Sequence, residues 1–77
     1  MHRSLIHVSY RDGSKPKGMR VSLSFHGLMG GVTKDFYTDK DGTAIVEHAS
    51  TGTVDVIVGG TKYGSFRAPG ETVVFLN

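Results

Sequence analysis

Hydrophobic and polar residues alternate along most of this chain. The pattern is clearest in residues 19–26, where every second residue is apolar: Met19, Val21, Leu23 and Phe25. A period of two with polar residues on one face is typical of half-buried antiparallel strands. Similar segments predict seven short strands, near residues 4–10, 19–26, 32–38, 43–48, 53–58, 61–67 and 72–76.

Glycine and proline separate these segments. The chain has 11 glycines and 2 prolines, and the longest stretch without either is residues 1–12. Globular helices average about 11–12 residues, so little room remains for one. Asp12-Gly13 and Asp41-Gly42 are turn-forming pairs between alternating segments. The sequence therefore predicts an all-β fold, a seven-stranded antiparallel sandwich or small barrel.

The 77 residues allow one domain, with an ordered core expected at about residues 4–76. A folded chain of this size hides roughly 62% of its unfolded surface, so the core must be small. We expect the following residues to be buried: Ile6, Val8, Val21, Leu23, Phe25, Phe36, Val54, Val56, Val58 and Phe75.

Composition excludes several classes of site. The chain has no cysteine, which rules out disulfides, thiolate metal sites and a cysteine nucleophile. The longest apolar run, Val73 to Leu76, is far too short to cross a membrane. The absence of cysteine suits both a cytosolic protein and an exported, disulfide-free bacterial protein.

Positive charge is concentrated at the start of the chain. The net charge is +2, but residues 1–20 alone carry +4, so the remaining 57 residues carry −2. The cations are not interleaved with the aromatic residues on which single-stranded nucleic acids stack. We therefore expect them to keep a loop and an edge strand soluble, and we expect no nucleic-acid partner.

Several short motifs follow one another in a familiar order. Residues 13–23 place a Pro-x-Gly after an Asp-Gly turn and before an alternating strand, and residues 38–44 contain Thr-Asp-x-x-Gly. Residues 52–58 begin with Gly and continue as a valine-rich strand, and residues 62–64 contain Tyr-Gly. Together, over residues 4–76, they resemble transthyretin-like, carboxypeptidase-regulatory-like domains. The resemblance implies a seven-stranded, Ig-like sandwich that is typically a non-catalytic module of a larger protein.

The same resemblance bears on catalysis. Transthyretin-like enzymes that hydrolyse 5-hydroxyisourate use His and Arg side chains and end in Tyr-Arg-Gly-Ser. This chain ends in Phe-Leu-Asn, and its similar run, Tyr63-Gly64-Ser65, is internal and lacks the arginine. No serine lies in a Gly-x-Ser-x-Gly sequence. We expect no enzymatic activity.

Two patterns suggest metal ligands, and both have a simpler interpretation. His7 and His26 fall on the outward side of their strands and could lie near each other, with Glu47 or His48 as a third ligand. However, no two histidines have the spacing of a metal-binding pair, and we expect surface imidazoles.

The run Asp39-x-Asp41-Gly42 also invites a calcium interpretation. Two of the carboxylates that an EF-hand loop needs are missing from the surrounding positions. A tight turn explains the same residues, so we expect neither a metal nor another cofactor.

The least ordinary segment is the tip at residues 26–31, which places Leu28 and Met29 between glycines. Large apolar residues in a turn either cap the core or contact a partner. We expect a monomer or weak oligomer that acts as a structural or protein-interaction module. A protein partner, or another domain of a host protein, would dock at Leu28 and Met29, with Arg11, Lys15 and Lys17 steering its approach.

Carbohydrate binding is the alternative function. Sandwiches can stack sugars on exposed aromatic side chains, and Tyr37 and Tyr63 are the candidates.

Overall fold

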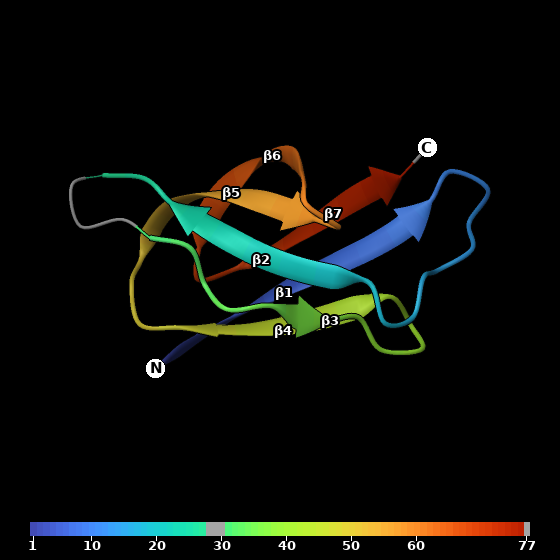
Figure 1. Cartoon of the computed structure of the whole chain (residues 1–77), viewed down its shortest axis with the longest axis horizontal. Coiled ribbons are helices and arrows are strands. Elements are labelled where there is room, and N and C mark those ends of the chain that lie inside the picture. The colour runs from blue at the N-terminus through green and yellow to red at the C-terminus, as the bar shows by residue number, and fades with distance from the viewer. Residues whose placement is uncertain (28–30, 77) are drawn as a thin grey trace.

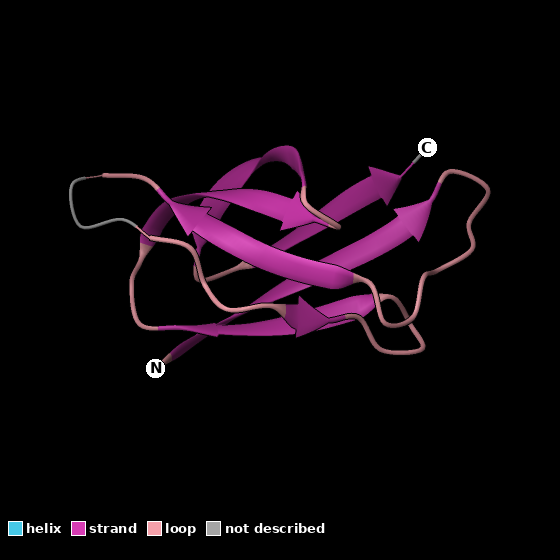
Figure 2. Ribbon diagram, in the orientation of Figure 1, coloured by secondary structure: helices cyan, strands magenta, loops and turns pink. Residues whose placement is uncertain are grey.

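The structure, a computed structural model, describes residues 1–27 and 31–76. Within these residues it contains seven strands and no helix (Figures 1 and 2). The strands are β1 (His2–Tyr10), β2 (Arg20–Phe25), β3 (Phe36–Tyr37), β4 (Thr43–His48), β5 (Gly52–Val58), β6 (Thr61–Ala68) and β7 (Glu71–Leu76). The prediction of an all-β chain with seven strands is confirmed.

The third strand is much shorter than the predicted 32–38. Thr33 interrupts the pairing with β2, because its hydroxyl accepts the amide hydrogen of Leu23 at 3.0 Å. Val32 forms only an isolated bridge with Ser24. Regular pairing with β2 resumes at β3, two residues long.

The strands form two sheets. The four-stranded sheet has the order β3-β2-β5-β6 and is antiparallel throughout. The three-stranded sheet has the order β4-β1-β7, with β4 antiparallel to β1 and β7 parallel to it. The prediction of an entirely antiparallel arrangement is therefore wrong. The chain leaves β6 in the other sheet and crosses over at Pro69-Gly70, so that β7 enters beside β1 in the same direction (Figure 1).

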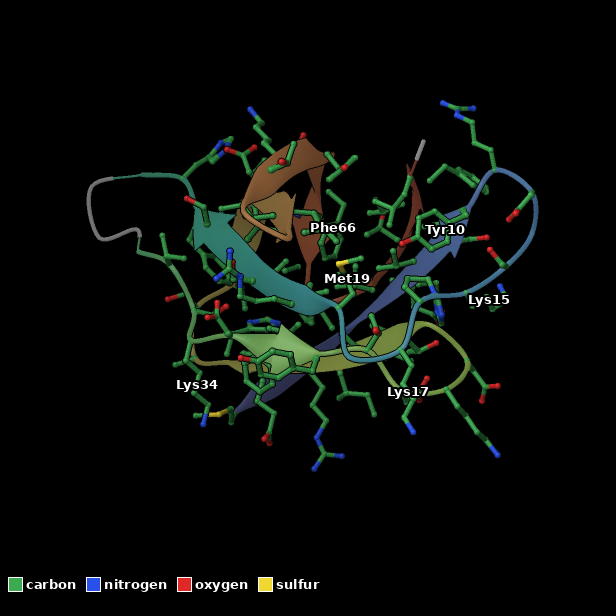
Figure 3. The ribbon with its side chains drawn as sticks, turned by 45° about the vertical axis from the view of Figure 1, so that its right-hand side comes forward. Tyr10, Lys15, Lys17, Met19, Lys34 and Phe66 are labelled. Carbon is green, nitrogen blue, oxygen red and sulfur yellow. The ribbon has the colours of Figure 1, made fainter. Side chains whose placement is uncertain are left out.

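The core lies between the sheets, where alternate residues of β1, β2, β4, β5 and β7 face inward. Tyr10, Met19 and Phe66 pack against it (Figure 3), as do Phe25 and Phe36, which are only partly buried. Its buried members are Ile6, Val8, Val21, Leu23, Ala44, Val46, Val54, Val56, Val58, Ala68, Val74 and Leu76.

The prediction that Phe75 is buried is wrong, because its side chain is 54% exposed. Residues 73–76 are all apolar, so the pattern of polarity does not reveal which alternate set faces inward. Pairing with β1 decides it: Val74 lies beside the buried Val8, and Leu76 continues on the same face. Phe75 therefore points to the outer surface.

His48 is also placed differently from the expectation of a surface imidazole, since it is buried. It follows Ala44 and Val46 on the inward side of β4. Its Nε2 lies 2.8 Å from the hydroxyl of Ser4, and its Nδ1 lies 2.7 Å from the carbonyl oxygen of Ser50. The ring also contacts Phe25, with centroids 5.3 Å apart. His48 thus closes one end of the core with its polar atoms satisfied.

The other end is closed by the loop of residues 11–19, which packs against the turn at residues 39–42. The hydroxyl of Thr38 donates to the carbonyl oxygen of Pro16 at 2.8 Å and accepts the amide hydrogen of Met19 at 2.9 Å. Gly18 donates its amide hydrogen to the carbonyl oxygen of Thr38. These bonds hold the basic loop against Thr38, which directly precedes the turn at residues 39–42.

Candidate functional site

Each sheet has two edges, and three of the four edges carry features that hinder pairing with another chain. Edge strand β3 has only two residues. Edge strand β6 has an irregular register with β5 and carries Lys62 and Arg67. Edge strand β4 carries Glu47, which pairs with Arg3 at 3.8 Å. Short strands, bulges and charged side chains are the usual means by which edges avoid pairing.

The fourth edge, β7, has none of these features from Thr72 to Leu76. This stretch reads Thr-Val-Val-Phe-Leu, with no charge and no proline, and it pairs with β1 in an unbroken register. In Figure 1, β7 runs beside β1 to the C-terminal end, and no further strand accompanies its arrowhead on the other side. We refer to this side of β7 as the open edge.

The backbone of β7 alternates between β1 and the open edge. Gly70 and Leu76 direct their carbonyl oxygens toward β1, where they accept amide hydrogens from Leu5 at 2.9 Å and from Arg11 at 3.2 Å. Successive residues of a strand direct their N–H and C=O groups to opposite sides. Three residues therefore present both groups at the open edge: Glu71, Val73 and Phe75.

The side chains of these residues lie on the outer face of the three-stranded sheet. Val73 is 55% exposed and Phe75 54% exposed. Ile45, on the far edge of the same sheet, is 51% exposed, and Leu5 lies between the two edges. This face is therefore more apolar than a solvated sheet face of alternating strands normally is.

His7 ties the charged end of β7 to the rest of the sheet. Its Nε2 lies 2.8 Å from a carboxylate oxygen of Glu71, and its Nδ1 lies 2.9 Å from the hydroxyl of Thr43. Because a carboxylate only accepts hydrogen bonds, Nε2 carries the proton. The imidazole thus holds Glu71, the only charged residue of β7, toward β1 and away from the open edge.

The basic residues that were expected to steer a partner are not part of the open edge. Arg11, Lys15 and Lys17 are exposed in the loop at one end of the molecule, where Lys15 and Lys17 extend into solvent (Figure 3). The segments on either side of residues 28–30 lie at the opposite end of the 38 Å long axis (Figure 1). Leu28 and Met29 themselves lie outside the described residues, so their contact with a partner stays a prediction.

The positive end is also less basic than the sequence suggests. Loop residues 11–19 carry three cations and Asp12, and they lie at the same end of the molecule as the turn at residues 39–42, which holds Asp39, Lys40 and Asp41 (Figure 1). Four cations therefore share this end with three carboxylates. Long-range steering is strongest in a field of one sign, and steering by these cations stays a prediction.

The two tyrosines proposed for sugar stacking are exposed on opposite edges of the four-stranded sheet. Tyr37 belongs to β3 and Tyr63 to β6, with β2 and β5 between them. They do not form one stacking platform, and carbohydrate binding stays a prediction.

The structure separates the histidines that were considered as metal ligands. His7 lies on the three-stranded sheet, whereas His26 follows β2 in the other sheet. His26 Nε2 lies 3.0 Å from Oδ1 of Asp55, and Lys62 Nζ lies 3.4 Å from the same oxygen. Neither contact has the alignment of a hydrogen bond to Oδ1. The proximity of His26, more than that of Lys62, lowers the pKa of Asp55. Among the described residues, no three His, Asp or Glu side chains are grouped to hold a metal ion.

A pocket of about 260 Å³ opens beside His48 at the tip end. Its lining includes Phe25, Val32, Thr33 and Ser50. The Ser4–His48 pair beneath it has the residue types of a nucleophile and its base, but Ser4 is completely buried. Its hydroxyl also accepts the amide hydrogen of Gly70 at 3.2 Å. The pair is thus placed to stabilise the core, with the Ser4 hydroxyl shielded from solvent.

Sequence reasoning missed the open edge. A signal was present in residues 73–76, because a strand that is apolar at every position has apolar side chains on both faces.

No helix in the part of the chain that the structure describes is long and apolar enough to cross a membrane. Searches of protein-family models, of curated proteins and of solved structures found no match to this chain.

Proposed function

We propose that this chain is a non-catalytic protein-interaction module that binds an extended segment of a partner protein along β7. The observation that carries the proposal is the contrast between the four edges. Three have charges, a bulge or very short length, whereas the open edge belongs to a strand with five consecutive uncharged residues, Thr72 to Leu76. Strand addition of this kind takes its affinity from main-chain hydrogen bonds and its specificity from alternate side chains.

We also propose that the fold is an Ig-like sandwich of the transthyretin-like type. The support is the order of short motifs in the sequence together with seven strands in two packed sheets. A small module without an accessible nucleophile in its Ser4–His48 pair fits an accessory role in recognition.

The open edge supplies both parts of a strand-binding site. Val73 and the residues two positions away offer outward N–H and C=O groups, each hydrogen bond contributing about 0.5–1.5 kcal/mol net. The exposed side chains of Val73 and Phe75 add apolar contacts on the outer face. Because ordering the incoming segment opposes these gains, we expect weak, reversible binding.

The test uses a capped, fluorescently labelled peptide of alternating threonine and valine with lysines at its ends. We expect this peptide to bind the wild-type chain, measured by fluorescence anisotropy. Val73→Pro should weaken binding by about tenfold or more, since it removes the central donor of the open edge. The lost N–H points away from β1, so the domain itself loses no hydrogen bond.

Ile45→Pro is the matched control. Ile45 has similar exposure, lies on the same sheet, and directs its N–H away from β1 at the other edge. It should leave peptide binding unchanged, and circular dichroism should show both variants folded. Binding that is equal in wild type and Val73→Pro, or absent from both, would contradict the proposed function.

A further inference from the structure

We infer that the partner strand at the open edge is β7 of a second copy of this chain. The two β7 strands would run antiparallel about a two-fold axis at Val73 and join the two three-stranded sheets into one of six strands. This inference rests on the proposed function, because it uses the same edge.

The outward groups of β7 are self-complementary in one register. Glu71, Val73 and Phe75 are spaced by two residues, and with Val73 opposite Val73 of the second copy, Glu71 lies opposite Phe75. All three residues on each strand then find partners, which makes about six main-chain hydrogen bonds. A register centred on Glu71 or on Phe75 would leave outward groups of the strand unpaired.

Charge favours the same register. Pairing centred on Glu71 would place two carboxylates directly opposite each other, which is destabilising. Pairing centred on Val73 separates them by four residues along the strand, about 14 Å. Each Glu71 carboxylate also lies 2.8 Å from Nε2 of His7 in its own chain. At the centre, Val73 meets Val73, and apolar side chains pair on the outer face.

The arrangement closes after two copies. A two-fold interface uses the same surface on both chains, so pairing consumes both open edges at once. The opposite edge of the enlarged sheet is β4, which carries Glu47. A single pair of six-residue strands buries less than the roughly 1,000 Å² of a stable interface. We therefore expect a weak dimer whose population depends on concentration, and no fibre.

Charge substitutions at Val73 test both the dimer and its register. Sedimentation velocity of the wild-type chain should show an average mass that rises from monomer toward dimer with concentration. Val73→Lys and Val73→Glu should each remain monomeric, because like charges would oppose each other on the axis. An equimolar mixture of the two should dimerise again, since lysine then opposes glutamate. Ile45→Lys, with the charge on the same face but at the other edge, should dimerise like the wild type.

A single introduced cysteine provides a second measurement, since the chain contains none. In the proposed register the two Cα atoms of residue 73 lie about 5.5 Å apart, within the range of a disulfide. Mild oxidation should therefore link Val73→Cys into a covalent dimer and leave Ile45→Cys mainly monomeric. A mixture of Glu71→Cys and Phe75→Cys should form the mixed dimer in preference to either self-linked dimer.

The outcomes separate this inference from the proposed function. A wild-type chain that stays monomeric up to millimolar concentration, or a mixture of charge variants that fails to dimerise, overturns self-pairing. If the threonine–valine peptide still binds and Val73→Pro abolishes that binding, strand addition stands and its natural strand belongs to another protein. If the peptide also fails to bind, both proposals fall.

Discussion

Two glycines with almost the same φ, Gly18 and Gly42, have very different surroundings. Gly42 has φ of 75° and Gly18 has φ of 73°, a region that disfavours residues with a Cβ atom. At Gly42 a Cβ would collide with the carbonyl oxygen of Val8 and lie 3.0 Å from Cβ of Lys15. At Gly18 it would meet nothing within 4 Å. Only Gly42 is therefore restricted by both conformation and packing.

Alanine at these two positions should separate the two effects. We expect Gly42→Ala to lower the free energy of unfolding by about 2–4 kcal/mol, from backbone strain and overpacking together. Gly18→Ala should cost only about 1–2 kcal/mol, from backbone strain alone. Urea denaturation of both variants measures the difference. Equal losses would show that the contact between Gly42 and Val8 is not tight.

For His48, position in the strand predicts burial better than residue type does. Histidine is polar and was expected at the surface, yet it follows Ala44 and Val46 at a spacing of two on the inward face of β4. The alternation along β4 therefore predicts correctly that His48 faces inward. The sequence does not predict its hydrogen-bond partner, because Ser4 lies 44 residues away and only the register of β1 with β4 brings the two together.

At the scale of elements, the turn between β3 and β4 depends on one carboxylate. Oδ1 of Asp39 accepts the amide hydrogens of Asp41 at 2.8 Å and of Thr43 at 3.0 Å. The hydrogen bond from Thr43, followed by that from Asp41, holds the pKa of Asp39 below its ordinary value of 3.8. The predicted tight turn and the positive φ of Gly42 are both present.

This turn should make stability depend on pH. Because the folded-state pKa of Asp39 is lowered, its contribution is fully present above about pH 4. The contribution is lost as the pH falls through the lower folded value, since the unfolded state binds the proton first. Asp39→Asn keeps an acceptor oxygen but does not titrate, so its free energy of unfolding should fall less steeply than the wild type's between pH 5 and pH 2. Parallel pH profiles from denaturant titrations would show that Asp39 does not contribute.

Elements differ in how far the sequence specifies them. β2 and β5 alternate apolar with mostly polar residues, so their buried faces were predicted correctly at Val21 and Val54. β7 is apolar on both faces, so Phe75 was assigned to the wrong one. Its parallel direction was not predictable either, because strand direction depends on how the chain crosses between sheets at Pro69 and Gly70.

At the scale of the whole molecule, folding redistributes both charge and apolar surface. The basic loop at residues 11–19, with a net charge of +2, shares one end of the molecule with the turn at residues 39–42, whose net charge is −1. The apolar end of the chain instead stays open, because β7 enters the three-stranded sheet at its edge. Local composition therefore overestimates the net positive charge around the basic loop and underestimates the exposed apolar surface of β7. The site that we propose lies on a sheet edge, and docking at Leu28 and Met29 stays a prediction.

Amide hydrogen exchange along β7 tests the open edge most directly. In dilute wild-type protein, followed by NMR, the amides of Thr72, Val74 and Leu76 should be protected by β1, whereas Val73 and Phe75 should exchange almost as fast as an unfolded chain. Adding the threonine–valine peptide, or raising the protein concentration, should slow exchange at Val73 and Phe75. Strong protection of these two amides in the dilute monomer would contradict the account, because their hydrogens would already be bonded within the chain.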